Sequence, residues 1–274
     1  MQRAVLIMFV AMSLIPSGDA AGKLMTSTMG VAPIFVAWSR FALGALLVLP
    51  FLPPQTMMLL KNWRIWIRAS LLACGISSIQ MALVSTDIAT VFAAFFIGPM
   101  FSYVLATIFL REPVTILRSL LVLLGFAGVL LVVRPGVGGD LGVLWAVLAG
   151  LFYGAFLTMS RWLGGIAPPM ALIFTQLLIA GILTLPFGVL HLPSLTAPIA
   201  ALTLVSASCS MLGNLLLLYA YRLAPATKLA PLVYFQLIAA TILGWSIFGN
   251  LPDAYTWSGL ILIIGAGLAS ARLR

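Results

Sequence analysis

Long apolar segments of about twenty residues alternate with short polar turns along the whole sequence. Twenty helical residues span about 30 Å, the thickness of the hydrocarbon core of a bilayer. The segments are apolar on all sides, which is typical of helices surrounded by lipid. We therefore predict an all-α integral membrane protein with ten transmembrane helices, at about residues 3–25, 31–52, a third ending near 85, 88–110, 116–133, 141–163, 168–190, 198–221, 228–248 and 256–271.

Composition excludes a soluble domain. Hydrophobic residues make up 63% of the chain and charged residues only 7%, whereas a soluble domain carries about 25% charged residues. The alternating ten-residue segments of a transmembrane β-barrel are absent from the sequence. In such a chain the net charge of +9 reflects the asymmetry of its loops. The bilayer is the expected partner, and nucleic acid is not.

The positive charges fall mainly on one side of the predicted topology. With the N-terminus in the cytoplasm, only Lys23 and Arg134 lie outside, and eleven lie inside: Arg3, Lys61, Arg64, Arg68, Arg111, Arg118, Arg161, Arg222, Lys228, Arg272 and Arg274. Cytoplasmic loops are enriched in Lys and Arg. We expect a bacterial-type inner (plasma) membrane protein with both termini cytoplasmic. A cleaved signal peptide at the N-terminus is the alternative, and it would leave nine spans.

Two stretches indicate an internal duplication. Residues 32–51 and 168–187 align without gaps at an offset of 136, so that Arg40 meets Gln176 and both copies end in Leu-Pro-Phe. Gly75 and Gly213 pair at an offset of 138. Each half, 1–137 and 138–274, contains five predicted spans, and an odd number makes the halves inverted repeats. Inverted repeats are the architecture of alternating-access transporters, in which substrate binds near the midplane.

Several motifs resemble a known family. Arg40 follows Ala32-Pro33 in the second span, and Gly98-Pro99 precedes the run from Leu110 to Pro113 in the fourth. The chain resembles the EamA-type ten-span permeases of the drug/metabolite transporter superfamily, and the run 235–245 is similar to that of YddG-type exporters of aromatic amino acids. This resemblance implies an inner-membrane exporter with a central cavity lined mainly by spans one, three, four, six, eight and nine. The second copy of this motif runs from Gln236-Leu237 to Phe248-Gly249-Asn250. It departs from the pattern, with leucine in place of the proline and asparagine in place of the glutamate.

Three charged residues fall inside or at the mouth of predicted spans. Asp19 and Lys23 are four residues apart and share a helix face. They form a proton or ligand site if the first helix includes them, and are solvated if it ends near Gly18. Arg40 either binds a substrate carboxylate or ties helices together, and we favour the structural role because a superfamily with many substrates shares it.

Polar and aromatic residues of the central spans are candidates for substrate binding. Tyr, Asn and Gln need partners in hydrocarbon, and tyrosine offers a ring and a hydroxyl to an amphipathic solute. Packing or lipid contact is the alternative for an aromatic stripe. The candidates are Tyr103, Tyr153, Asn214, Tyr234, Gln236, Gln80 and Phe156.

Enzyme chemistry has no visible basis in the sequence. There is no nucleophile–base pair, carboxylate pair or phosphate loop, and the single histidine, His191, gives no metal-binding pattern. Cys74 and Cys209 fall in spans, where we expect apolar packing and no disulfide. We expect no cofactor and make no prediction of oligomeric state. The predicted function is alternating-access export of small metabolites, most of all neutral or aromatic amino acids. A passive channel, a carrier of another metabolite or of a cationic drug, and a receptor or assembly subunit are the alternatives.

Overall fold

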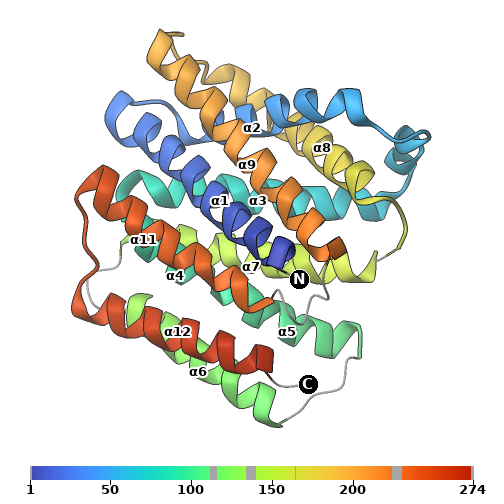
Figure 1. The fold of residues 1–274 in the computed structure, drawn as a ribbon. Coiled ribbons are helices and arrows are strands. Elements are labelled where there is room, and N and C mark those ends of the chain that lie inside the picture. Colours follow the sequence, from blue (N-terminus) through green and yellow to red (C-terminus); the bar gives the residue numbers. More distant parts are fainter. Residues whose placement is uncertain (1, 112–115, 134–139, 164, 224–229, 273–274) are drawn as a thin grey trace.

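The computed structural model describes residues 2–111, 116–133, 140–163, 165–223 and 230–272, and these residues form a helical bundle (Figure 1). Within these described ranges, seven helices are long and apolar enough to cross a membrane, and three shorter apolar helices bring the total to the predicted ten. The α-helices are α1 (Gln2–Met29), α2 (Pro33–Val48), α3 (Trp63–Ser85), α4 (Ile88–Phe95), α5 (Ile97–Phe109), α6 (Ile116–Val133), α7 (Leu141–Trp162), α8 (Pro169–Leu190), α9 (Ala197–Leu223), α11 (Phe235–Phe248) and α12 (Ala254–Arg272). Short 3₁₀ segments are η1 (Leu49–Phe51), η2 (Thr56–Lys61) and η3 (Ala230–Tyr234).

The helix contacts follow a pseudo-twofold pattern. Helix α1 packs along α9 of the second half, and α3 of the first half packs along α7. In each of the other three equivalent pairs the two partners contact each other: α2 contacts α8, α4 contacts α11, and α6 contacts α12. Both chain termini lie at the same end of the bundle in Figure 1. The predicted fold class, two inverted five-helix repeats, is confirmed.

Two glycine contacts show the same symmetry at the level of single atoms. A Cβ placed on Gly213 would lie 3.2 Å from the Ala11 carbonyl oxygen, and a Cβ on Gly75 would lie 3.5 Å from the Ala149 carbonyl oxygen. Gly213 lies 138 positions after Gly75, and Ala149 lies 138 positions after Ala11, so the offset of the repeats relates the two contacts. Small residues at these crossings let the backbones of α1 and α9, and of α3 and α7, approach closely.

The predicted fourth span is broken in the middle, between α4 and α5. Pro99 has no N–H to donate to the carbonyl of Phe95, four residues earlier, so the hydrogen bond that would continue the helix through this turn is missing. That carbonyl oxygen lies against Gly150 of α7, where an added Cβ would be 2.6 Å away. The ninth span is interrupted at the corresponding place, where η3 ends at Tyr234 and α11 begins. Pro99 explains the break between α4 and α5. The break between η3 and α11 occurs although leucine, Leu237, stands at the position equivalent to Pro99.

Helix α4 is the central element of the bundle. Nearly all of its residues are buried, and its side chains share one apolar core with α3, α7, α11 and α12. The GxxxG pair Gly150 and Gly154 lies where α7 crosses the α4–α5 break, with Gly154 against the Gly98 carbonyl. The two glycines therefore let α7 approach the α4–α5 break closely.

Two helix boundaries decide where charged residues lie. Helix α1 includes Asp19 and Lys23, as the predicted span 3–25 does, and runs on to Met29. Arg64 and Arg68, which were counted with the cytoplasmic positive charges, lie in the first turns of α3. This helix starts early because the side chain of Asn62 caps it, accepting a hydrogen bond from the Arg64 N–H at 3.0 Å.

Candidate functional site

The two helix breaks meet at the interface between the repeats. Phe96 directly follows α4, Tyr234 ends η3, and their ring centroids are 5.2 Å apart. These residues are 138 positions apart, the offset that relates the repeats. Symmetry-related residues that touch each other lie around the pseudo-twofold axis. Broken helices at the repeat interface are where transporters of this architecture bind their substrates.

Further rings extend from this contact to form an aromatic cluster of Phe95, Phe96, Tyr153, Phe156 and Tyr234. The centroids of Phe95 and Tyr153 are 4.9 Å apart, and the Tyr153 and Phe156 rings stack at 5.8 Å. Phe95 also contacts Phe96, at 6.5 Å. Each aromatic contact contributes about 0.5–1.5 kcal/mol beyond its buried area. The cluster thus joins α4 and the α4–α5 break to α7 and to the end of η3.

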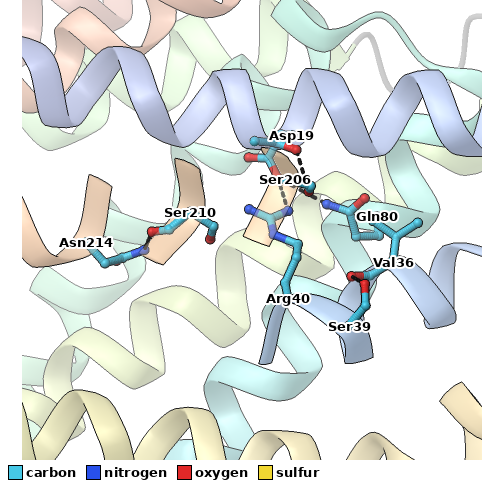
Figure 2. A network of polar contacts seen from close by, with 9 residues as sticks. Asp19, Val36, Ser39, Arg40, Gln80, Ser206, Ser210 and Asn214 are labelled. Atoms are coloured by element: carbon cyan, nitrogen blue, oxygen red, sulfur yellow. Dashed lines mark hydrogen bonds and ion pairs between the residues drawn. The ribbon is translucent and has the colours of Figure 1, made fainter. Parts of the chain in front are cut away.

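The structure brings together some of the predicted binding residues and places others elsewhere. Tyr153, Phe156 and Tyr234 belong to the aromatic cluster. The Tyr103 hydroxyl is instead 3.1 Å from that of Ser119 on α6. Asn214 donates a hydrogen bond to the Ser210 carbonyl of its own helix at 2.8 Å (Figure 2). Gln236 is buried in the first turn of α11.

A second polar centre joins three helices of the first repeat. The guanidinium of Arg40 forms an ion pair with the carboxylate of Asp19, and both side chains are less than 5% exposed. Gln80 donates a hydrogen bond to the same carboxylate oxygen at 3.0 Å. Figure 2 shows Arg40 and Gln80 pointing toward Asp19 from different helices. Asp19 is therefore partnered with Arg40 and not with Lys23, and the alternative in which Asp19 and Lys23 are solvated is wrong because both are buried.

This polar network also reaches α9. Ser206 donates a hydrogen bond from its hydroxyl to the Gly18 carbonyl at 2.7 Å (Figure 2). Because Arg40 already has a carboxylate partner inside the protein, the geometry supports its role as a tie between helices over that of a substrate ligand. Two atoms of the network, Arg40 Nε and Gln80 Oε1, are buried without a hydrogen-bond partner among the described residues.

A polar tie lies at the end of the bundle opposite the chain termini, and its members are Lys23, Thr86, Asp87, Asp140 and Asn250. The ammonium of Lys23 donates hydrogen bonds to the carbonyls of Leu83 at 2.9 Å and Thr86 at 2.7 Å, at the C-terminal end of α3. A cation is favourable there because carbonyls at a helix end lack N–H partners. Asn250 of the second repeat donates to the carboxylate of Asp87 in the first.

Asp140 provides the other link across this end. Its carboxylate caps α7 by accepting the Gly142 N–H at 2.9 Å, and it accepts hydrogen bonds from the hydroxyls of Thr86 and Ser85. Burial raises the pKa of Asp140, but these hydrogen bonds and the charge of Lys23 outweigh it and leave the pKa below its ordinary value. The carboxylate therefore stays ionised at neutral pH and holds the repeats together at this end.

Arg68 is a buried cation that sequence reasoning missed. Its side chain is 8% exposed, and its guanidinium carbon lies 4.6 Å from the centroid of the Phe156 ring. Its Nε donates to the Ser160 hydroxyl at 2.8 Å, and its Nη1 is 3.4 Å from the Leu172 carbonyl oxygen. A signal was present, because positions 65, 68, 69 and 72 share one helix face and the other three are apolar.

Metal and disulfide chemistry add nothing to these centres. In the part of the chain that the structure describes, no three His, Cys, Asp or Glu side chains come together in a way that could hold a metal ion. Cys74 and Cys209 are both free thiols.

Comparison with known proteins gives consistent relatives. The profile of the EamA-like transporter family matches residues 2–134 and again 140–270. An S-adenosylmethionine uptake transporter of Rickettsia bellii is 26% identical over 91% of this chain and 88% of its own length. A riboflavin transporter of Brucella anthropi is 27% identical over 95% of both chains, and one of Rhizobium johnstonii is 28% identical over 89% of this chain and 82% of its own.

One solved crystal structure shares the fold. It has a TM-score of 0.66, covers 99% of this chain and 97% of its own, and is 18% identical in sequence. The relatives are named for S-adenosylmethionine and riboflavin and not for aromatic amino acids, so the finer resemblance to YddG-type exporters is not supported. Because the family profile matches nearly the whole sequence in two consecutive copies, the chain belongs to the EamA-like transporter family, a family of small-molecule transporters and not of enzymes.

Proposed function

We propose that this protein carries small organic molecules containing a planar, fused heterocyclic ring across the membrane, with the ring held in the aromatic cluster. The observation that carries the proposal is the stack of rings at the meeting point of the two helix breaks, Phe95, Tyr153 and Phe156 together with Phe96 and Tyr234. Ring faces bind planar solutes through offset or edge contacts. Such contacts favour extended, flat ring systems over single small side chains.

The relatives support the same class of substrate. S-adenosylmethionine contains an adenine ring, and riboflavin contains a three-ring isoalloxazine. The two compounds for which the relatives are named therefore share a fused nitrogen heterocycle. At 26–27% identity the relatives do not identify the substrate of this chain. The fused ring that their two named compounds share is nevertheless the kind of group that an aromatic cluster binds. We therefore place a heterocyclic metabolite ahead of the neutral or aromatic amino acids that the sequence resemblance implied.

We also propose that transport proceeds by alternating access. The polar tie closes the end of the bundle opposite the termini by joining Thr86 to Asp140 and Asp87 to Asn250, one residue from each repeat. Inverted repeats can exchange conformations, so a contact made at one end can be replaced by its counterpart at the other. A passive channel, the alternative, has to be open at both ends at once.

A substitution in the aromatic cluster tests the substrate class. Tyr153→Ala should reduce uptake of S-adenosylmethionine or riboflavin into proteoliposomes, because it removes the ring between Phe95 and Phe156. The loss of its two ring contacts, at about 0.5–1.5 kcal/mol each, predicts a reduction of about 5- to 150-fold. Tyr103→Ala is the matched control, since the Tyr103 hydroxyl contacts Ser119 on α6 and not the cluster.

Each outcome has a defined meaning. A loss for Tyr153→Ala with retention for Tyr103→Ala supports the proposal, provided that both variants melt at similar temperatures. Equal losses of uptake in the two variants would contradict the assignment of the aromatic cluster as the substrate-binding site, because Tyr103 lies outside the cluster. If the wild-type protein carries tryptophan or phenylalanine but neither heterocycle, the substrate class proposed here is wrong.

A further inference from the structure

Arg68 is a charged group in an apolar setting without an acidic partner. Its described contacts are the Ser160 hydroxyl, the Leu172 carbonyl and the face of Phe156, all of them uncharged. A buried charge is expensive unless an opposite charge compensates it. Neutral hydrogen bonds and a cation–π contact offset only part of this penalty.

The acidic residues that the structure describes are all engaged elsewhere. Of the five in the sequence, Glu112 lies outside the described residues. Asp19 pairs with Arg40, Asp87 accepts a hydrogen bond from Asn250, and Asp140 accepts one from Thr86. Asp253 caps the N-terminus of α12. The counter-charge for Arg68 is therefore not provided by the described part of the chain.

The second repeat shows that a cation is not needed for packing at this place. The position equivalent to Arg68 at the offset of 138 is Ser206, and the position equivalent to Phe156 is Gly18. In that copy the two helices are joined by the hydroxyl of Ser206 and the carbonyl of Gly18, 2.7 Å apart. A neutral pair thus makes the same helix contact. The charge of Arg68 requires a reason beyond the joining of α3 to α7.

The position of Arg68 supplies that reason. Phe156, whose ring lies under the guanidinium, stacks on Tyr153, which in turn contacts Phe95. The cation therefore lies at one end of the aromatic cluster. Guanidinium has five N–H donors in a planar fork that matches the two oxygens of a carboxylate or phosphate. The Nε and Nη1 atoms have partners in the protein, and the remaining nitrogen, Nη2, belongs to a side chain that keeps some exposed surface.

We propose that Arg68 binds an anionic group, a carboxylate or a phosphate, of a substrate whose ring system lies in the aromatic cluster. This inference rests on the proposed function, because it assumes that the cluster holds the ring. It narrows the substrate class from any fused heterocycle to a heterocycle that bears an anionic group. Among the chemistries of the relatives, it fits the carboxylate end of S-adenosylmethionine and has no counterpart in uncharged riboflavin.

Two pairs of ligands test the inference by equilibrium binding to the purified protein. S-adenosylmethionine is compared with decarboxylated S-adenosylmethionine, which keeps the ring, the sulfonium and the amine and lacks only the carboxylate. Riboflavin 5′-phosphate is compared with riboflavin, which keeps the ring and lacks the phosphate. We expect the wild-type protein to prefer the member that carries the anionic group in at least one pair, and the pair that shows the preference distinguishes carboxylate from phosphate.

The variant Arg68→Gln should bind the preferred ligand about 10- to 100-fold more weakly and its counterpart without the anionic group as the wild type does. Arg64→Gln is the matched control, because Arg64 lies one turn earlier on α3 with its guanidinium over Trp162, away from the cluster. Arg68→Lys keeps the charge and should keep part of the preference, which gives a second variant if Arg68→Gln does not fold.

Several results would overturn the assignment. If the wild type binds both members of each pair equally, or if Arg68→Gln weakens both members to the same extent, Arg68 has no role in anion recognition, although the ring site stands. If the wild type binds none of the four compounds, the proposed function itself fails. These outcomes are distinguishable because only the last removes binding of the ring compounds that lack an anionic group.

Discussion

Removing one partner of the buried ion pair between Asp19 and Arg40 should destabilise the protein strongly. Arg40→Gln leaves the carboxylate of Asp19 with only the hydrogen bond from Gln80, and Asp19→Asn leaves an unpaired guanidinium. Glutamine is an informative replacement because the second repeat carries Gln176 at the equivalent position. The double variant Asp19→Asn/Arg40→Gln removes both charges and keeps groups that can form hydrogen bonds.

The magnitude follows from burial. Both side chains are less than 5% exposed, so water cannot replace the lost partner. Breaking a buried ion pair by removing one member costs about 3–5 kcal/mol, whereas replacing both members by neutral groups is often nearly neutral. For a chain of this size, the single variants should lower the melting temperature on the order of 10 °C. The double variant should recover most of that loss.

The assay is thermal unfolding of the four proteins in the same detergent, followed by transport measurements at a temperature where all are folded. The coupling between the two sites is read from the double-mutant cycle. If Asp19→Asn or Arg40→Gln alone melts like the wild type, or if the double variant is less stable than both singles, the ion pair is not the tie inferred here. Normal transport by a folded Arg40→Gln variant would also exclude Arg40 as a substrate ligand.

Three further predictions concern packing, pH and topology. Gly98→Ala places a Cβ 2.7 Å from the Gly150 carbonyl oxygen and should destabilise by about 1–3 kcal/mol in thermal unfolding, whereas the control Gly265→Ala, with open space around it, should not. Asp140→Asn should lower the melting temperature at neutral pH. Because the pKa of Asp140 is lowered in the folded protein, its contribution is present above about pH 3.9 and lost as pH falls through the folded value, so the difference from wild type should vanish only in strong acid. Reporter fusions should give a periplasmic signal at His191 and a cytoplasmic signal at the C-terminus, and a periplasmic C-terminus would contradict the predicted orientation.

Much of the fold is readable from the sequence because lipid imposes simple rules. Helices in a bilayer must be long, apolar and internally hydrogen-bonded, so their number follows from hydropathy alone. The offset of 138 between Gly75 and Gly213 reappears as equivalent backbone contacts with α7 and α1. The break after Phe95 was not predicted, because a proline in an apolar run does not by itself end a helix: Pro16 and Pro186 lie inside the helices α1 and α8.

The site is less predictable, because periodicity gives the face of a residue and not its partner. Asp19 and Lys23 share a face, yet each finds its partner on another helix, Arg40 for the first and the end of α3 for the second. Tyr103 and Tyr153 are equally suitable by type, and only the packing of α5 against α6 directs the Tyr103 hydroxyl to Ser119. Partners of this kind depend on tertiary contacts that one sequence does not encode locally.

Solute counterflow tests the central claim, that this chain is a carrier of heterocyclic metabolites working by alternating access. Proteoliposomes loaded with unlabelled S-adenosylmethionine or riboflavin are diluted into a trace of the labelled compound, and accumulation is followed with time and concentration. We predict a transient, saturable accumulation of label that requires the unlabelled substrate inside, because a carrier exchanges one molecule for another. Entry that is linear in concentration and independent of internal substrate would indicate a channel, and entry equal to that of empty liposomes for both compounds would contradict the claim altogether.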